Sequence, residues 1–565
     1  MATATYRDYS LTLKQSELRA AIARFSDASI KPSAREIDGG NYPSQILREL
    51  AIAGFTQAGF PSEVGGTDMD SVSWALIIAE VARGSGSAGL ALGVTGTASL
   101  PLLRLANARQ RKALLPVVNG ETPGVYAQSE PGQGSDVAGI TTTARQVERD
   151  GIPGWELSGH KLWISNAWLG PDRRAHWAVV LCQTGEVGNR RTMRFFLVPL
   201  DLPGIEVQKI NTTGMRGSGT SQIFFDRAFV PEEALLGNDD AGFQAAMQVL
   251  GASRIFFSAR GLGIVEAAVD MVGHLLSEAQ TASDNDPRIP LAISRLHFLE
   301  AKAFNLRALV YRVARLRDAG QPFDHQVAIL KLIAGNTAID VTSEAYNLML
   351  FLGASAEDLK DADRIARDSK QIPLAEGTSE IMERIIARDL AASLRSDGGP
   401  SLRSMLVNPQ GMNDMFTKAE HVADFLDLLL DLAKAAYRDA SETGEERLLN
   451  FDLMTESGDQ QRYSKLLPLS PIPSPRQEPL GAERALAGLE ITCYEVRTLS
   501  EALIGTVEMD FDYPAHVATK NLIDSKATSA VAQTHAVFEA LGQNNYWTQV
   551  GSMIFSRASL FGRQQ

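Results

Sequence analysis

The sequence predicts an α+β protein of several domains. Apolar residues recur at helical spacing near the N-terminus, short β-branched and aromatic runs replace them in the middle, and long helical patterns then return. The chain has 565 residues, of which 44% are hydrophobic and 21% charged, so a globular protein with a sizeable core is expected. We predict an N-terminal α-helical domain, a middle β-barrel or sandwich domain, a C-terminal four-helix bundle and an extra C-terminal helical domain.

Helical spacing dominates residues 1–120, as in LTLKQSELRAAIARF and SWALIIAEVARG. Residues 121–240 contain short β-branched and aromatic runs bounded by Gly, Pro, Asn or Asp, such as HWAVVLCQ and SQIFFDRAFV. Long helical patterns occupy residues 241–395 and suit an antiparallel bundle. We therefore expect the first three domains to have these boundaries.

The rest of the chain begins with a breaker-rich linker at 396–412, and an additional helical domain is predicted at 413–565. Within it, prolines between 466 and 481 forbid regular helix. The tail segment YPAHVATKNLIDSKATSAVAQTHAVFEALG resembles HQVAILKLIAGNTAIDVTSEAYNLMLFLG of the bundle. Either the two segments share only an Ala-rich helical composition, or the tail is a degenerate copy of the bundle.

Charge and cysteine content exclude several classes of function. The formal net charge of -13 disfavours binding to nucleic acid, which depends on a dense Lys and Arg surface. Cys182 and Cys493 are the two cysteines of the chain, so neither a disulfide framework nor a Cys-based metal site is predicted. The histidines show no metal-ligand spacing. We expect no metal, no membrane span, no signal peptide and a reduced, cytoplasmic compartment.

One carboxylate stands in a setting that is typical of chemistry. Glu376 precedes Gly377, Thr378 and Ser379, after which Glu380 begins an amphipathic helical pattern. The Glu376 side chain is either a general base exposed at a break in the chain, or a group that caps the following helix or faces its dipole.

Two further stretches are typical of ligand binding. YAQSEPGQGSDVAG, from Tyr126 to Gly139, allows tight turns in which backbone N–H groups and hydroxyls face a ligand. In the later stretch GHKLWISNA, Trp163 and Ser165 are expected on the same side of a strand. Trp163 is either a core residue or an aromatic surface for a ligand.

The order and separation of several motifs resemble those of the acyl-CoA dehydrogenase flavoproteins. The motifs are Y-x-x-S-E-P-x-x-G-S-D from Tyr126, K-x-W-I-S-N from Lys161, G-M-R-G-S from Gly214, V-P at Val230 and E-G-T-S-E-I from Glu376. The resemblance covers roughly residues 10 to 395, and that family's architecture is the predicted succession of helical, β and helical domains. It implies an FAD-dependent oxidoreductase of fatty acid metabolism.

The resemblance also implies roles for individual residues. Positions that hold the flavin ring and its ribityl-phosphate arm in the family correspond to Tyr126, Gln128, Ser129, Gly134, Ser135, Trp163, Ser165 and Thr378. Trp163 would pack against the isoalloxazine. Positions that contact the acyl thioester correspond to Ser135, Arg254 and Gly377.

Glu376 corresponds to the family's general base, which removes the α-proton of the acyl thioester while the β-hydrogen leaves as hydride to flavin N5. Its backbone N–H, together with a ribityl hydroxyl, would bind the thioester carbonyl. Some family members place their base just before the arginine that corresponds to Arg254. Here that residue is Ser253, which cannot act as a carboxylate base.

Two departures from the family pattern concern the substrate and the cofactor. Ala375 stands where a tyrosine is usual, which implies a wider pocket for a bulky or α-branched acyl group. The motifs with which a neighbouring subunit usually binds the FAD pyrophosphate and adenosine are missing, and of Q-x-x-G-G-x-G only Gly353 survives. Either a different subunit supplies these contacts, or the chain's own C-terminal part does, or FAD binding has weakened.

The expected enzyme is an acyl-CoA dehydrogenase that makes a trans-2-enoyl thioester and passes electrons to an electron-transfer flavoprotein. Its acyl carrier is coenzyme A or an acyl-carrier protein, and it assembles as a homo-oligomer or with a related subunit. Two alternatives stay open. One is an acyl-CoA oxidase, in which dioxygen reoxidises the flavin, and the other is a non-catalytic binding or regulatory relative.

Overall fold

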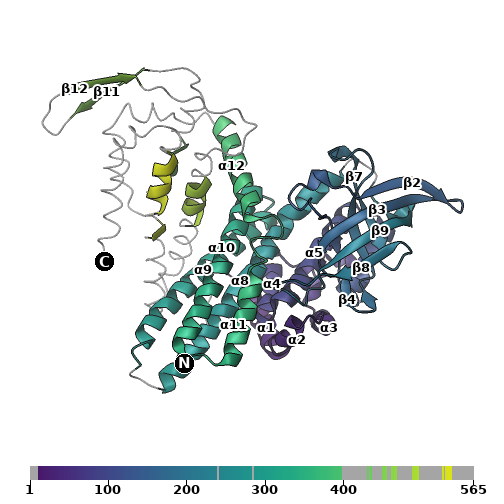
Figure 1. The fold of residues 1–565 in the computed structure, drawn as a ribbon, viewed down its shortest axis with the longest axis horizontal. Coiled ribbons are helices and arrows are strands. Elements are labelled where there is room, and N and C mark those ends of the chain that lie inside the picture. The colour runs from purple at the N-terminus through teal and green to yellow at the C-terminus, as the bar shows by residue number, and fades with distance from the viewer. Residues whose placement is uncertain are drawn as a thin grey trace. The chain divides into compact units, whose positions relative to one another are not determined.

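A computed structural model describes residues 11–237, 241–282 and 286–396, together with short segments between 429 and 537. The chain divides into two compact units, Met1–Met382 and Glu383–Gln565. Nearly all of the predicted linker and most of the predicted extra helical domain, including its proposed repeat, lie outside the described residues. The predicted fold class is confirmed: a helical part, a β part and a second helical part follow one another along the chain (Figure 1).

From residue 11 on, where the described part of the chain begins, seven α-helices precede the first strand. The first of them begins at a capping box, in which the Thr12 hydroxyl accepts from the Gln15 N–H and the Gln15 side chain accepts from the Thr12 N–H. The helices are α1 (Leu13–Phe25), α2 (Lys31–Asp38), α3 (Ser44–Ile52), α4 (Ser71–Gly84), α5 (Gly86–Leu105), α6 (Ala108–Arg111) and α7 (Leu115–Val118).

The middle of the chain forms an eight-stranded sheet in the order β10-β7-β6-β2-β3-β9-β8, and β1 pairs in parallel with β6. The strands are β1 (Tyr126–Ala127), β2 (Thr143–Arg149), β3 (Ile152–Ile164), β6 (Trp177–Gln183), β7 (Met193–Pro199), β8 (Ile205–Lys209), β9 (Ser221–Pro231) and β10 (Leu235–Leu236). The short strands β4 (Trp168–Gly170) and β5 (Arg173–Arg174) pair separately.

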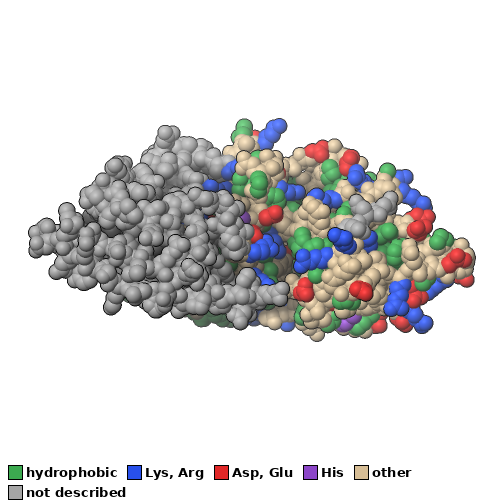
Figure 2. Space-filling model, turned by 90° about the horizontal axis from the view of Figure 1, so that it is seen from above, with side chains coloured by type: hydrophobic (Ala, Val, Ile, Leu, Met, Phe, Trp, Pro, Cys, Tyr) green, Lys and Arg blue, Asp and Glu red, His purple; other side chains and the backbone are tan. Residues whose placement is uncertain are grey.

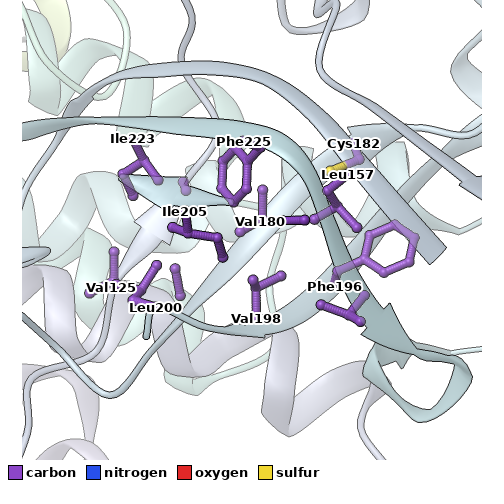
Figure 3. Close-up of a cluster of buried hydrophobic side chains, with 14 of the residues drawn as sticks. Val125, Leu157, Val180, Cys182, Phe196, Val198, Leu200, Ile205, Ile223 and Phe225 are labelled. Atoms are coloured by element: carbon purple, nitrogen blue, oxygen red, sulfur yellow. The ribbon is translucent and has the colours of Figure 1, made fainter. Parts of the chain in front are cut away.

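Strand β6 is buried on both faces, which explains its unbroken apolar sequence. On one face Val180 and Cys182 join a cluster that includes Phe196 and Phe225, part of which Figure 3 shows. On the other face Val179 and its neighbours pack with side chains of the N-terminal helices. One face of the sheet therefore packs on the N-terminal helices, and the other face packs on side chains of the β part itself.

Among the described residues up to 396, five helices follow the sheet. They are α8 (Gly242–Ala282), α9 (Ile289–Asp318), α10 (Asp324–Leu352), α11 (Ala356–Ser369) and α12 (Ser379–Ser396). Three of them, α8, α9 and α11, pack on α4 or α5. Helix α8 crosses α4 closely, since a Cβ on Gly263 would lie 2.0 Å from the Ala79 carbonyl oxygen. Gly353 caps α10 with a φ of 82°, a left-handed conformation that favours glycine. The one glycine that survives from the family's cofactor motif thus has a structural reason of its own.

Helix α5 is long and apolar enough to cross a membrane by length and composition alone. Residues 84–103 carry no charged side chain, a feature that the sequence-based expectation of no membrane span did not take into account. In the structure, 61% of the apolar window is buried, and α5 packs against α4 and α8. Core helices of globular proteins share this composition.

Two strands lie within the region that was predicted as an additional helical domain. Strands β11 (Leu448–Met454) and β12 (Gln460–Leu466) pair antiparallel, and the sequence patterns did not predict them.

On the face that Figure 2 shows, Lys and Arg side chains of the described residues are interspersed with Asp and Glu.

Candidate active site

Glu376 lies in the loop between α11 and α12 in a left-handed conformation, with a φ of 60°. Gly377 follows with a φ of 97°. A non-glycine residue in this region costs free energy, and such residues are enriched at active sites, where neighbouring groups hold them in place. The contacts of this loop are therefore informative about function.

Helix α8 provides two of these contacts. The Ser253 hydroxyl donates to Oε2 of Glu376 over 2.7 Å, and Nε of Arg254 donates to the Glu376 carbonyl oxygen over 3.0 Å. Ser253 occupies the position at which some relatives place a base, and here it is a hydrogen-bond donor to the carboxylate. The sequence predicted Arg254 at the site but as a substrate contact, and it did not predict the role of Ser253.

Helix α10 provides the third contact, which the sequence patterns also missed. Nζ of Lys331 donates to the Gly377 carbonyl oxygen over 2.6 Å, and the lysine is fully buried. Burial lowers the pKa of Lys331 to about 7, and the charge of Glu376 opposes that change. A signal was present in the sequence, because this lysine interrupts the apolar run AILKLIAG.

Thr378 caps helix α12. Its hydroxyl accepts a hydrogen bond from the Ile381 N–H over 3.3 Å, and its carbonyl oxygen accepts from the Met382 N–H. The sequence left open whether Glu376 caps this helix or acts as a base. Thr378 supplies the cap, so the Glu376 side chain is not needed for capping. A contact between Thr378 and the cofactor stays a prediction.

Tyr126, the first residue of β1, lies near enough to Glu376 for the two groups to interact electrostatically, although 250 positions separate them in the sequence. Burial, and next the charge of Glu376, raises the pKa of Tyr126 well above its usual value. The phenol donates to Oε1 of Gln128 over 2.7 Å. The fold therefore brings the first motif of the predicted flavin site beside the predicted base.

Lys161 fixes the segment that follows Tyr126. Its buried Nζ donates to the Gln128 carbonyl oxygen over 3.0 Å and to Oε1 of Glu130 over 2.8 Å. Glu130 also accepts from the backbone N–H groups of Thr141 and Thr142. Although burial opposes ionisation of Glu130, the Lys161 charge and these hydrogen bonds lower its pKa to about 2. The sequence motifs contained both residues without indicating that they pair.

Trp163 is an exposed aromatic residue beside the same segment. Its side chain is 59% exposed, its φ is 64°, and the adjacent Leu162 N–H donates to the Ser129 carbonyl oxygen over 2.9 Å. The sequence predicted a regular strand with Trp163 and Ser165 on the same side, and this prediction is wrong. The pairing of β3 with β9 shifts its register here, and Ser165 is buried just after the end of the strand. An uncovered indole held in an unfavourable conformation beside Ser129 fits the flat ring of a flavin.

Gly134 and Ser135 lie on an exposed loop after the turn at Gly132. Among the described residues, no hydrogen bond or ion pair joins Ser135 to Glu376. Their predicted contacts with cofactor and substrate stay predictions.

A narrow pocket begins at Glu376 and runs between α5 and α8. Its walls are formed by Gly89, Gly93, Val94 and Thr97 of α5, by Ser253, Phe256, Phe257 and Arg260 of α8, and by Glu376. Ala375 is not part of this lining, so the wider pocket inferred from it stays a prediction. A carboxylate in the wall of a pocket that has both apolar and polar lining residues can remove a proton from a bound organic substrate.

Comparisons with known proteins agree with this arrangement. Models of the N-terminal, middle and C-terminal domains of acyl-CoA dehydrogenases match residues 12–121, 125–228 and 240–391. The human mitochondrial short-chain specific acyl-CoA dehydrogenase is 31% identical over 383 residues, covering 66% of this chain and 89% of that protein.

Solved structures share the fold. The butyryl-CoA dehydrogenase of Megasphaera elsdenii has a TM-score of 0.62 and 27% identity, covering 68% of this chain and 100% of its own. An acyl-CoA dehydrogenase of Bacillus anthracis has a TM-score of 0.77 over 98% of this chain and 95% of its own; at 19% identity it shows the fold alone. Domain models, sequence identity and fold agree that the chain belongs to the acyl-CoA dehydrogenase family of FAD-dependent oxidoreductases.

Proposed function

We propose that the protein oxidises an acyl-CoA thioester to the trans-2-enoyl-CoA, with Glu376 as the base that takes the α-proton. Bound FAD supplies the acceptor for the β-hydride. The observation that carries the proposal is the position of Glu376, which lines a narrow pocket and lies near enough to Tyr126 of the predicted flavin segment to interact with it electrostatically.

The neighbours of Glu376 suit a base that must be oriented before substrate binds. Ser253 donates a hydrogen bond to its carboxylate and so fixes the direction of the side chain. Arg254 and Lys331 hold the carbonyl oxygens of Glu376 and Gly377, so the loop is fixed on both sides of the base. Preorganisation of this kind lowers the barrier of the chemical step.

The segment from Tyr126 to Ser129, with Trp163 and Ser165, is proposed to hold the flavin. The exposed indole would cover one face of the ring, and the Lys161–Glu130 pair keeps the segment against β3. We further propose an electron-transfer flavoprotein as the electron acceptor, an oligomeric assembly, and a cytoplasmic compartment that keeps the buried Cys182 and Cys493 reduced.

An anaerobic titration of the full-length flavoprotein tests the proposal. Addition of a series of acyl-CoA thioesters should bleach the visible flavin band with at least one member, and Glu376→Gln should prevent bleaching while it leaves the flavin bound. Air is then admitted: slow recovery of the band supports a dehydrogenase, and fast recovery supports the oxidase alternative. If no thioester bleaches the flavin, the enzymatic proposal is wrong and a binding role is supported.

A further inference from the structure

Arg260 is a buried cation in the wall of the pocket that begins at Glu376. It lies on α8 seven residues after Ser253, which places it about 10 Å further along the helix axis. Its side chain lines the pocket with Thr97 and Gly93 of the facing helix, and the residue is only 2% exposed. A charged group at this depth requires a partner.

The protein does not supply a full partner. Nη2 of Arg260 donates to Oε1 of Gln371 over 2.7 Å, and this acceptor is neutral. Nε is buried without a hydrogen-bond partner, and among the described residues no carboxylate lies within ion-pair distance. Burial lowers the pKa of Arg260 to about 9, and the more distant charges of Glu376 and Asp368 offset this only in part.

Among the described residues the other buried arginine is Arg364, and it forms an ion pair with Asp361 over 3.5 Å. The partly buried Arg83 and Arg307 form ion pairs with Glu80 and Glu266. Burial without a carboxylate is therefore not the general rule for arginine in this fold. Phe257 stacks on the Arg260 guanidinium, with the ring centroid 4.0 Å from Cζ, and so orients the free N–H groups without neutralising them.

The facing wall leaves room beside these groups. A Cβ added to Gly93 would meet a single neighbour, Cδ1 of Ile78, at 3.9 Å. Neither close packing nor a left-handed backbone requires glycine at this position, although glycine in a helix interior is unfavourable. Gly93 therefore adds no side chain to the wall of the narrow pocket that also contains the incompletely paired cation.

We propose that Arg260 binds a carboxylate at the far end of the acyl group, so that the substrate is the coenzyme A monothioester of a short dicarboxylic acid. The guanidinium can donate two parallel hydrogen bonds to a carboxylate. This carboxylate takes no part in bond making or breaking; the α-proton still passes to Glu376 and the β-hydride to the flavin. The inference rests on the proposed function and names its substrate class.

Matched thioester pairs test the inference on the full-length flavoprotein. We compare succinyl-CoA with butanoyl-CoA, glutaryl-CoA with pentanoyl-CoA, and adipyl-CoA with hexanoyl-CoA, measuring kcat/KM with an artificial electron acceptor. In the wild type, kcat/KM should be higher for at least one dicarboxylic thioester than for its unsubstituted partner. Arg260→Met should lower the ratio of these two kcat/KM values by about 10- to 100-fold. Arg260→Lys should retain part of the preference. Arg364→Met, which removes a buried arginine of α11 outside the pocket lining, should leave the ratio unchanged.

A binding measurement separates this inference from the proposed function. Calorimetric titration of Glu376→Gln, with and without Arg260→Met, gives the Kd of each thioester without turnover. A preference for the dicarboxylic member that disappears with Arg260→Met supports the inference even if no thioester is oxidised. If the wild type prefers every unsubstituted thioester and Arg260→Met changes neither kcat/KM nor Kd ratios, the inference is wrong, whatever the outcome for the reaction.

Discussion

Ser253 is the residue that distinguishes the carboxylate of Glu376 from a solvated surface glutamate. An ionised carboxylate accepts hydrogen bonds and cannot donate them, so the Ser253 hydroxyl must be the donor in the 2.7 Å contact. The hydroxyl also lies 3.2 Å from the Leu250 carbonyl oxygen, which competes for its single proton. The shorter contact to the charged carboxylate assigns this proton to Glu376.

Ser253→Ala should lower kcat/KM by about 10- to 100-fold. The lost hydroxyl is a hydrogen-bond donor that orients the charged carboxylate, and one hydrogen bond to a charged group contributes about 1.5–3 kcal/mol. Steady-state rates with the best thioester substrate measure the loss. Ser253→Thr keeps a hydroxyl and should restore most of the rate; an unchanged kcat/KM in Ser253→Ala would contradict the assigned role.

Lys331 should make stability depend on pH. Its pKa in the folded protein is about 7, lowered by burial from 10.5, so between these values the unfolded chain binds more protons. Stability should therefore rise with pH across this window, by at most about 1.4 kcal/mol per pH unit. Below pH 7 lysine is protonated in both states, and the dependence should vanish.

Urea unfolding of the wild type and Lys331→Met at several pH values between 6 and 10 measures this effect. The difference in the free energy of unfolding between the two proteins should change with pH above 7, because methionine has no proton to lose. Curves that stay parallel over the whole range would show that Lys331 titrates as an ordinary surface lysine.

At the scale of single elements, α5 combines a structural role with a functional one. It is buried against α4 and α8, and its glycines Gly89 and Gly93 line the pocket. Gly89 is required for packing, since its Cβ would lie 2.6 Å from Cβ of Ala82. Gly93 has no such constraint.

Gly93→Ala should stabilise the protein and impair it as an enzyme. Replacing a helical glycine contributes about 0.5–1 kcal/mol to the free energy of unfolding, while the added methyl group narrows the pocket. We expect higher stability in urea together with lower kcat/KM, most for the bulkiest acyl groups. Gly96→Ala, on the same helix but outside the pocket lining, is the control that should keep its activity. Unchanged kcat/KM in Gly93→Ala for every thioester would show that the acyl group does not reach α5.

The secondary structure of an element was predictable from the sequence where the apolar pattern of that segment alone determines it. The unbroken apolar run of β6 and the long helical patterns of α8 and α10 identify their own secondary structure. The irregular end of β3 was not predictable, because the positive φ of Trp163 depends on the register with β9 and on the hydrogen bond from Leu162 to Ser129. Local alternation carries no information about such a shift.

At the scale of the whole molecule, the site is assembled from segments that are distant in sequence. Motif spacing predicted Glu376, Tyr126 and Arg254 because each lies in a recognisable local string. Ser253 and Lys331 reach the loop only through the crossing of α8 and α10, over sequence separations of 123 and 46 residues. A single sequence does not encode such pairings in any local pattern, so their roles required the structure.

The assembly also explains why Arg260 was not recognised as a site residue. In the sequence it is one polar residue in a long helical pattern, and such residues usually face solvent. Its burial results from the packing of α5 on α8, which closes the pocket over it. The charge becomes relevant to substrate binding because the same pocket also contains Glu376.

The rate of flavin reduction in a single turnover tests the role of Glu376 most directly. Anaerobic mixing of the flavoprotein with its best thioester substrate should reduce the flavin of the wild type, whereas Glu376→Gln should be slower by about 10² to 10⁴. Flavin content and thioester Kd should stay within a few-fold of the wild type, because glutamine preserves the shape of the loop. Flavin reduction by Glu376→Gln at a rate close to that of the wild type would show that another group takes the α-proton.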